Sequence, residues 1–197
     1  MNAPLPRKTP QPHTPGRAEQ ERAWIAGVRA GDAASFEGLF RAYHQPLCGF
    51  AWRYVGSADI AEEIVQEVLL RVWQHRETWD VSVSAKTWLY SAVRNAAMSW
   101  LRHERVVQRR DAETISIFDR APREADRELT DAETAAAVQA AIARLPERCR
   151  LVFTMHREQE LTYGEIAVVL EISPKTVDTQ MGRALKALRK HLRAHWR

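Results

Sequence analysis

Two helix-start signals near the C-terminal end of the chain constrain its fold more than any other feature. Thr162 can cap a helix, and Glu165 three residues later completes a capping box. Ser173 can cap a second helix that has Pro174 at its first position. Residues 171–173 alone lie between the two predicted helices, a separation that is typical of a DNA-reading helix-turn-helix.

The second of these helices separates into an apolar face and a basic face. At about 100° per residue, one face carries Val177, Met181, Ala184, Leu185 and Leu188, and the opposite face carries Lys175, Thr179, Arg183, Lys186 and Lys190. From residue 171 to residue 197, seven basic residues stand against two acidic ones, a net charge of +5. Most basic helices are only solvated amphipathic helices, but two capped helices at this separation favour DNA binding.

One residue departs from the tight turn that this motif favours. Glu171 stands where glycine is preferred, because a left-handed backbone costs a residue with a Cβ about 1 kcal/mol. Either the turn carries a small strain at Glu171, or it closes differently in this chain.

Composition narrows the class of protein. The chain has 197 residues, of which 45% are hydrophobic and 27% charged, and its net charge is +4. It has no phosphate-binding glycine loop and no β-branched runs, which argues against a nucleotide-binding α/β fold. Cys48 and Cys149 lack metal-ligand spacing, so we expect both to be buried apolar residues and expect no metal or other cofactor. Because neither a signal peptide nor a membrane span is visible, we expect a cytoplasmic protein.

The helical patterns fall into two blocks. Residues 1–19 are rich in proline and are predicted to be a disordered tail. Residues 20–106 carry four helical patterns, residues 107–131 have the mixed charges of a linker, and residues 132–197 carry the remaining helices. We therefore predict an all-α protein with two small helical domains joined by a flexible linker, the C-terminal one a helix-turn-helix.

Local signals place helix ends within the first block. Asp32 can cap the second helix, Pro46 can bend or interrupt it, and Gly56 closes it. Ser57 or Asp59 can open the third helix.

The third helix also has two unlike faces. Its apolar face carries Ile60, Ile64, Val65, Val68 and Val72, and its other face carries Asp59, Glu62, Glu63, Gln66, Leu70 and Trp73. Carboxylates interleaved with Leu and Trp indicate a docking face for a basic partner. The alternative is a solvated acidic stripe whose Trp73 folds into the core.

Aromatic and basic residues alternate in the segment that follows. Trp79, Trp88 and Trp100 stand among Lys86, Arg94, Asn95 and Arg102. Exposed aromatic rings beside Arg and Lys form a surface for unpaired nucleic acid. The alternative is that the three tryptophans belong to the core.

In these motifs the chain resembles the extracytoplasmic-function (ECF) type of sigma factor, a two-domain specificity subunit of bacterial RNA polymerase. Residues 62–73 resemble the family's helix that binds core polymerase, and residues 86–95 resemble its promoter-melting segment. Residues 161–189 resemble its terminal helix-turn-helix. The motifs stand in the family's order, over about residues 20 to 195.

The resemblance implies a function without chemistry of its own: the chain is not an enzyme, but binds core polymerase and directs promoter-specific initiation. Region two, residues 20–106, is implied to melt the minus-ten element, and region four, residues 132–197, to read the minus-thirty-five element. The implied polymerase contacts are the largest-subunit coiled coil and the flap, and the linker is implied to run toward the active-site and RNA-exit channels. An anti-sigma factor is a further expected partner, and no membrane insertion is expected.

The resemblance also implies which residues make each contact. The residues implied to bind core polymerase are Asp59, Glu62, Glu63, Gln66 and Leu70. The residues implied to bind minus-ten DNA are Ser82, Ser84, Lys86, Trp88, Arg94, Asn95 and Arg102. The loop from Asp80 to Lys86 is implied to hold a flipped base. The residues implied to bind minus-thirty-five DNA are Ser173, Lys175, Thr176, Thr179, Arg183 and Lys186.

Two other classes of protein remain open. A stand-alone helix-turn-helix regulator ends in a similar motif, although the first block has no α/β pattern to supply a phosphoacceptor domain. A metal-dependent enzyme or sensor could use His191 and His195, four residues apart on one helix face. Two histidines without a third ligand are more often surface residues.

Overall fold

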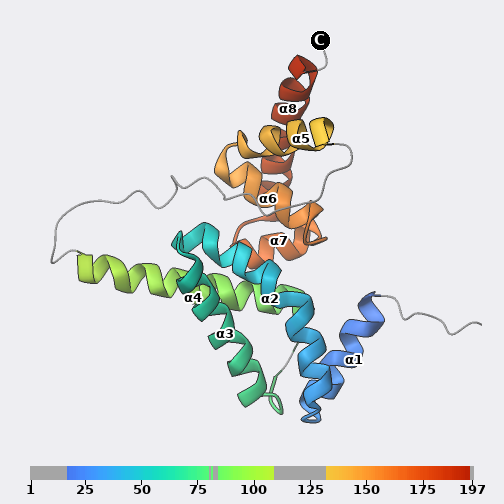
Figure 1. The fold of residues 1–197 in the computed structure, drawn as a ribbon, viewed down its shortest axis with the longest axis vertical. Helices are drawn as coiled ribbons and strands as arrows, with labels where there is room; N and C mark the ends of the chain where they lie inside the picture. Colours follow the sequence, from blue (N-terminus) through green and yellow to red (C-terminus); the bar gives the residue numbers. More distant parts are fainter. Residues whose placement is uncertain (1–16, 80, 82–83, 109–131, 196–197) are drawn as a thin grey trace, which may run out of the picture.

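Every regular element that the structure describes is a helix. The computed structural model describes residues 17–79, 81, 84–108 and 132–195, and no strand occurs in these ranges. Its helices are α1 (Arg17–Arg29), α2 (Ala33–Val55), α3 (Ala58–Gln74), α4 (Ala85–Gln108), α5 (Ala132–Ala143), α6 (Glu147–Arg157), α7 (Tyr163–Leu170) and α8 (Pro174–His195) (Figure 1). The all-α prediction is confirmed. Among the helices described, none is long and apolar enough to cross a membrane.

Side chains predicted as N-caps begin four of the helices. Asp32 accepts hydrogen bonds from two backbone N–H groups at the start of α2. Ser57, rather than Asp59, accepts one at the start of α3. The predicted capping box at Thr162 begins α7, and Ser173 accepts a hydrogen bond of 3.1 Å from the first turn of α8. Local side-chain chemistry therefore decides where these helices begin.

Pro46 neither ends nor splits α2, which continues through it. A proline inside a helix removes one N–H donor and crowds the preceding turn. Tyr43 and Leu47 lie on either side of this proline, and both are buried against neighbouring helices. Tertiary packing therefore holds α2 together at a position where the local sequence permits a break.

Two helices extend past the predicted ends of the first block. α1 begins at Arg17 rather than near residue 20, and α4 continues to Gln108 rather than ending by residue 106. The remainder of the predicted tail and linker, residues 1–16 and 109–131, lies outside the described residues.

The first block packs around α2. This helix lies against α1, α3 and α4, and its Leu39 and Leu47 are fully buried. Val65 of α3 and Leu89 of α4 are also fully buried against it. Burial of one such side chain stabilises the folded state by about 1.5–3 kcal/mol. The inward faces of α3 and α4 therefore form part of the core. The outward faces of these two helices remain for other contacts.

The second block packs around α8. Val177, Met181 and Ala184 are buried, as the predicted apolar face requires. The prediction that Leu185 packs with them is wrong, because its side chain is 40% exposed. Leu185 lies about 80° around the helix from Val177, at the edge of the apolar face.

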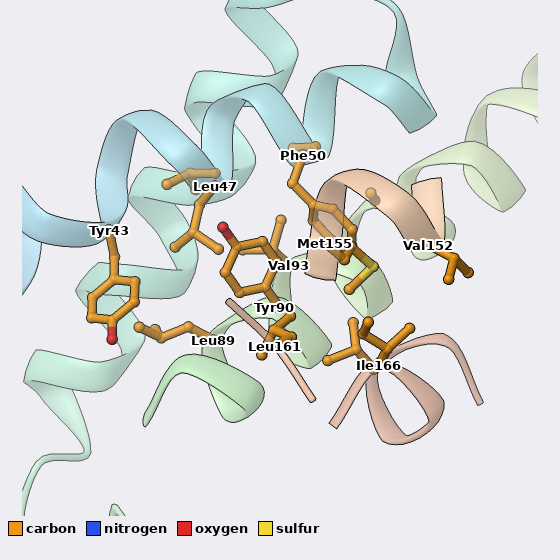
Figure 2. Packing of buried hydrophobic residues seen from close by; sticks show 14 of the residues in the cluster. Tyr43, Leu47, Phe50, Leu89, Tyr90, Val93, Val152, Met155, Leu161 and Ile166 are labelled. Atoms are coloured by element: carbon orange, nitrogen blue, oxygen red, sulfur yellow. The ribbon is translucent and has the colours of Figure 1, made fainter. Parts of the chain in front are cut away.

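The two blocks share one core, a contact that no sequence pattern predicted. α7 packs along α4, and the buried apolar residues of both blocks form a single cluster. Figure 2 shows the rings of Phe50 and Tyr90 beside Met155 and Leu161, which come from the second block. Tyr90 and Leu161 are 1% and 0% exposed, so both would be solvated if the blocks separated.

Replacing Leu161 by alanine should destabilise the protein by about 2–5 kcal/mol, because it leaves a cavity in the shared core. The control is Val168→Ala on α7, where the side chain is 53% exposed and the expected change is within about 0.5 kcal/mol. Urea unfolding followed by far-UV circular dichroism measures both. Equal shifts of the two midpoints would contradict the assignment of Leu161 to the shared core.

Candidate functional site

The acidic face of α3 is exposed. Asp59, Glu62, Glu63 and Gln66 all face solvent, and the side chain of Leu70 is 53% exposed. The Gln66 amide donates a hydrogen bond of 3.0 Å to Glu62 Oε1, which holds these two side chains together on the surface. The five residues that were predicted to bind core polymerase therefore form one accessible face.

Trp73 lies half-buried at the border between this face and α2. Its ring lies against the Phe36 ring with centroids 5.1 Å apart, and the Arg76 guanidinium stacks over it at 5.0 Å. Trp73 is therefore neither fully exposed with the acidic residues nor part of the fully buried core. Arg76 also donates a hydrogen bond to the Trp73 carbonyl, which fixes the guanidinium in this position.

The basic face of α8 is exposed as well. Lys175, Thr176, Thr179, Arg183 and Lys186 all face solvent. The Ser173 hydroxyl accepts a hydrogen bond from the Thr176 N–H and lies 2.8 Å from the Thr176 hydroxyl, so it already serves as the helix cap. The remaining side chains leave a row of cations and hydroxyls that suits a polyanion.

The turn between α7 and α8 is strained. Glu171 has φ 54° and ψ 44°, so the backbone adopts the left-handed conformation at a residue with a Cβ. Its N–H donates to the carbonyls of Ala167 and Val168, which closes α7. Of the two alternatives, the turn therefore carries the strain, which costs about 1 kcal/mol. The Glu171 carboxylate accepts from Arg94 Nη1 of α4 at 2.8 Å.

The three tryptophans that were predicted to stack on unpaired nucleic acid are all at least partly buried. Trp79 is only 4% exposed and belongs to the core, so its placement on a nucleic-acid surface is corrected. Trp88 and Trp100 are half-buried. The Trp88 ring contacts the Trp79 ring edge to face, with centroids 5.7 Å apart. Ser82, a predicted minus-ten contact, and Asp80 lie outside the described residues.

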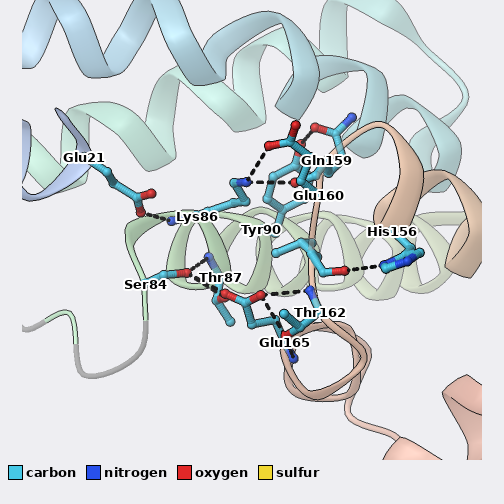
Figure 3. Close-up of polar contacts among 11 residues, drawn as sticks. Glu21, Ser84, Lys86, Thr87, Tyr90, His156, Gln159, Glu160, Thr162 and Glu165 are labelled. Carbon is cyan, nitrogen blue, oxygen red and sulfur yellow. Dashed lines mark hydrogen bonds and ion pairs between the residues drawn. The ribbon is translucent and has the colours of Figure 1, made fainter. Parts of the chain in front are cut away.

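The polar residues of α4 that were predicted to bind minus-ten DNA divide into two groups. Asn95 and Arg102 are exposed. Ser84 and Lys86 instead contact the second block (Figure 3), and so does Arg94.

The contacts of Lys86 are the most enclosed. Its side chain is 11% exposed, and its Nζ donates a hydrogen bond of 2.8 Å to the Gln159 carbonyl. The Glu160 carboxylate lies 4.0 Å from the same Nζ. The Lys86 backbone N–H donates to Glu21 of α1, which fixes the first turn of α4 at its N-terminal end.

Glu165 joins the capping box of α7 to α4. It accepts hydrogen bonds from the Thr162 N–H and hydroxyl, and also from the hydroxyls of Ser84 and Thr87, each 3.0 Å away (Figure 3). Burial by itself raises the pKa of Glu165, but the hydrogen bonds from Thr162, Thr87 and Ser84 outweigh it and hold the pKa below its ordinary value. The capping box was visible in the sequence, whereas the contact with α4 was not.

Further polar contacts between the blocks were missed by sequence reasoning. Arg53 of α2 donates a hydrogen bond of 2.7 Å to the Thr154 hydroxyl of α6. The Tyr90 hydroxyl donates to the Gln159 amide oxygen. These partners lie 101 and 69 residues apart in the chain, and no local pattern links residues at such separations.

Within the described part of the chain, both cysteines are free, and no metal site is found. Cys149 is buried, as expected, but Cys48 is only half-buried beside His44. No group of three or more His, Cys, Asp or Glu in the described residues could hold a metal ion. The side chain of His195, one of the two histidines considered as ligands, lies outside the described part.

Both blocks match known protein families. Residues 39–106 match the family described as Sigma-70 region 2, and residues 135–188 match Sigma-70, region 4. The first range contains the faces of α3 and α4 described above, and the second contains the helix-turn-helix. The fold and these surfaces define a sigma-70-type protein, a class of non-enzymatic transcription initiation factors.

Curated relatives narrow the class. ECF RNA polymerase sigma factor RpoE of Cereibacter sphaeroides is 32% identical over 177 residues, which are 86% of this chain and 94% of that protein. ECF RNA polymerase sigma factor SigW of Bacillus subtilis is 27% identical over 180 residues, which are 86% of this chain and 95% of that protein. The chain belongs to the ECF sigma factors.

Solved structures share the fold. The sigma factor RpoE from Bartonella quintana, solved in complex with the anti-sigma factor NepR, gives a TM-score of 0.60 at 21% identity, over 82% of this chain and 98% of that one. CnrH, solved in complex with the cytosolic domain of CnrY, gives a TM-score of 0.56 at 19% identity, over 89% of this chain and 98% of that one.

The stabilising effect of Glu165 should depend on pH. Because its pKa is lowered in the folded protein, its contribution is present above the ordinary carboxyl value of 4.5 and is lost as the pH falls through the lowered value. Glu165→Gln should therefore be less stable than wild type near pH 7, and the difference should shrink as the pH falls below about 4.5. Urea unfolding across a pH series measures it, and a difference that does not change with pH would contradict the assigned hydrogen bonds.

Proposed function

We propose that this sigma factor directs promoter-specific initiation by binding core RNA polymerase through region two and reading promoter DNA through both regions. The observation that supports this most strongly is an exposed acidic face on α3 and an exposed basic face on α8 of the same chain. These faces lie in the ranges that match Sigma-70 region 2 and Sigma-70, region 4. Faces of opposite charge suit two different partners, a basic protein surface and a polyanion.

The α3 face binds the basic coiled coil of the largest polymerase subunit, and the polymerase flap is the second contact. Asp59, Glu62 and Glu63 supply negative charge, which speeds encounter with a basic surface. Leu70, 53% exposed, adds apolar area that is buried on docking. Gln66 keeps the Glu62 side chain in place through its hydrogen bond.

Region two holds the minus-ten element as an unpaired strand. Asn95 and Arg102 contact bases and phosphates from the exposed side of α4. Trp88 has part of its ring available for stacking, and Ser82, Ser84, Lys86 and Arg94 complete the proposed set. A base flipped out of the duplex is bound here, so that recognition and strand opening become one event.

Region four reads the minus-thirty-five element in the major groove. Lys175 and Thr179 lie near the N-terminal end of α8, where side chains reach base edges. Arg183 and Lys186 lie further along the same face and contact phosphates. Ser173 and Thr176 are held at the helix start, beside the groove.

A stand-alone helix-turn-helix regulator is the alternative function. Run-off transcription with core polymerase on a pool of genomic fragments separates the two. A sigma factor gives discrete transcripts that need both the chain and core polymerase. A regulator binds DNA alone and gives no such transcripts. The complex of the solved relative from Bartonella quintana with the anti-sigma factor NepR supports an anti-sigma factor as a further partner.

Reversing the charge of the α3 face should weaken polymerase binding. Glu63→Lys with Gln66→Lys places two cations opposite a basic surface, and we expect the affinity for core polymerase to fall by about tenfold or more. The matched control is Glu37→Lys with Gln45→Lys on α2, which changes the net charge equally at two exposed positions. Pull-down with core polymerase measures the affinity, and circular dichroism checks the fold. Equal affinities of the two variants would remove α3 as the docking face.

The two ends of α8 should differ in what they contribute to DNA binding. Lys175→Ala should cost about 1–3 kcal/mol and relax base preference at one or two upstream positions. Lys190→Ala should weaken all sequences alike and lower the slope of the salt dependence by about one unit. Holoenzyme binding to a library randomised at the upstream element, over a salt series, measures both. The reverse result would mean that α8 lies in the groove in the opposite orientation.

A further inference from the structure

α1 makes a polar contact with the start of α4, far away in the sequence. The Glu21 carboxylate accepts a hydrogen bond of 3.0 Å from the Lys86 N–H, and the two residues are 65 positions apart (Figure 3). α1 ends at Arg29, before the range 39–106 that matches Sigma-70 region 2. The family match therefore does not account for this contact.

Two side chains cap the first turn of α4. The first N–H groups of an α-helix have no partner within the helix. Ser84, directly before α4, accepts a hydrogen bond of 3.1 Å from the Thr87 N–H. Glu21 accepts from the Lys86 N–H, and its negative charge also suits the positive end of the helix dipole. One cap is local and the other comes from a different helix, so the position of α1 affects the position of this turn.

Close packing against α2 holds α1 in place. A Cβ on Gly38 of α2 would overlap the Trp24 indole of α1, and a Cβ on Gly27 of α1 would overlap the Ser35 side chain of α2. Glycine inside a helix is destabilising relative to alanine. Its presence on both sides of this contact is explained by the close approach of the two helices. Glu21 lies three residues before Trp24 on the same helix, so this packing also fixes the place from which Glu21 reaches α4.

The turn that Glu21 caps carries part of the proposed minus-ten set. Ser84, Lys86 and Trp88 all lie at the start of α4. Contacts that distinguish one base from another need side chains in precise positions, which the second layer of residues around a site has to supply. The hydrogen bond from Lys86 to Glu21 lies wholly within the first block, so it does not depend on where the second block is placed.

We propose that Glu21 is a positioning residue for minus-ten recognition. α1 holds its carboxylate at the start of α4, and the carboxylate fixes the first turn from which the unpaired strand is read. Glu21 acts through the backbone of α4 rather than through contact with DNA. This inference rests on the proposed function, because it takes Ser84, Lys86 and Trp88 as DNA contacts.

The test measures base preference rather than total activity. Holoenzyme is assembled from core polymerase and the full chain, and it is offered a promoter identified by run-off transcription, with the minus-ten element randomised. Heparin-resistant complexes are collected, and their DNA is sequenced. The ratio between bases at one position does not depend on how much holoenzyme is active, so partial unfolding cannot imitate a change in preference.

Removing the acceptor should relax this preference. For Glu21→Ala we expect the preference for the best base at one or two minus-ten positions to fall by about threefold or more. Glu21→Gln keeps an oxygen that can accept from the Lys86 N–H, so it should stay within about twofold of wild type. The control is Glu19→Ala, which removes an exposed carboxylate from the same helix and should change nothing. A library randomised at the minus-thirty-five element should give the wild-type preference with every variant.

A second pair of variants tests the packing of α1 without changing Glu21. Gly38→Ala places a Cβ against the Trp24 indole and should relax the same minus-ten positions. Its matched control on α2 is Gly49→Ala, because no heavy atom lies within 4 Å of the added Cβ there. Combined with Glu21→Ala, Gly38→Ala should relax the preference no further, since both changes act through one contact.

Wild-type base preference in Glu21→Ala would overturn the proposal, even if total transcription falls, because that fall would reflect lost stability alone. The proposal also fails if Glu21→Gln or Glu19→Ala relaxes the preference as much as Glu21→Ala does. Equal preferences of Gly38→Ala and Gly49→Ala would remove α1 packing as the support of Glu21. Each of these results leaves the proposed function intact as long as wild type gives discrete run-off transcripts with core polymerase. If wild type gives none, the proposed function fails, and this inference fails with it.

Discussion

The packing of α4 against α7 is the contact on which the arrangement of this ECF sigma factor depends. Tyr90 and Leu161 are almost fully buried there, so apolar area withdrawn from water holds the two blocks together. Polar groups border this apolar contact, among them Lys86, Arg94 and Glu165. Hydrogen bonds and ion pairs at a partly buried border are weakened less by water and salt than those on an open surface. The apolar contact thereby strengthens the polar ones around it.

The same packing decides which functional surfaces are accessible. α3 and α8 point their charged faces away from the contact between the blocks, and both faces are exposed. α4 lies at that contact, so its donors are divided between solvent and the second block. Asn95 remains exposed while Lys86 is enclosed, although both belong to one helix. The exposure of the polar residues of α4 is therefore set by tertiary contacts rather than by the composition of the helix.

Much of the fold follows from local chemistry. The caps at Asp32, Ser57, Thr162 and Ser173 lie where side-chain oxygens were predicted to accept from the first turn, because a cap needs only residues two or three positions away. The order of three motifs along the chain was enough to indicate the ECF family, which the comparisons confirm. The faces of α3 and α8 followed from helical periodicity, with Leu185 at the edge of its face as the error.

The sequence by itself determined the helices, most of their starts, the charge of their faces and the family. Only the tertiary structure decided that Pro46 stays within a continuous helix, that Trp79 is core, and that the blocks share one core. It also showed that Glu165 serves both a capping box and a contact with Ser84, 81 residues away. The physical reason is range: caps and periodicity act within a turn or two of helix, whereas burial depends on segments brought together from distant parts of the chain. The strain at Glu171 was expected from its local position, but its partner Arg94 became visible only once α4 and α7 were packed together.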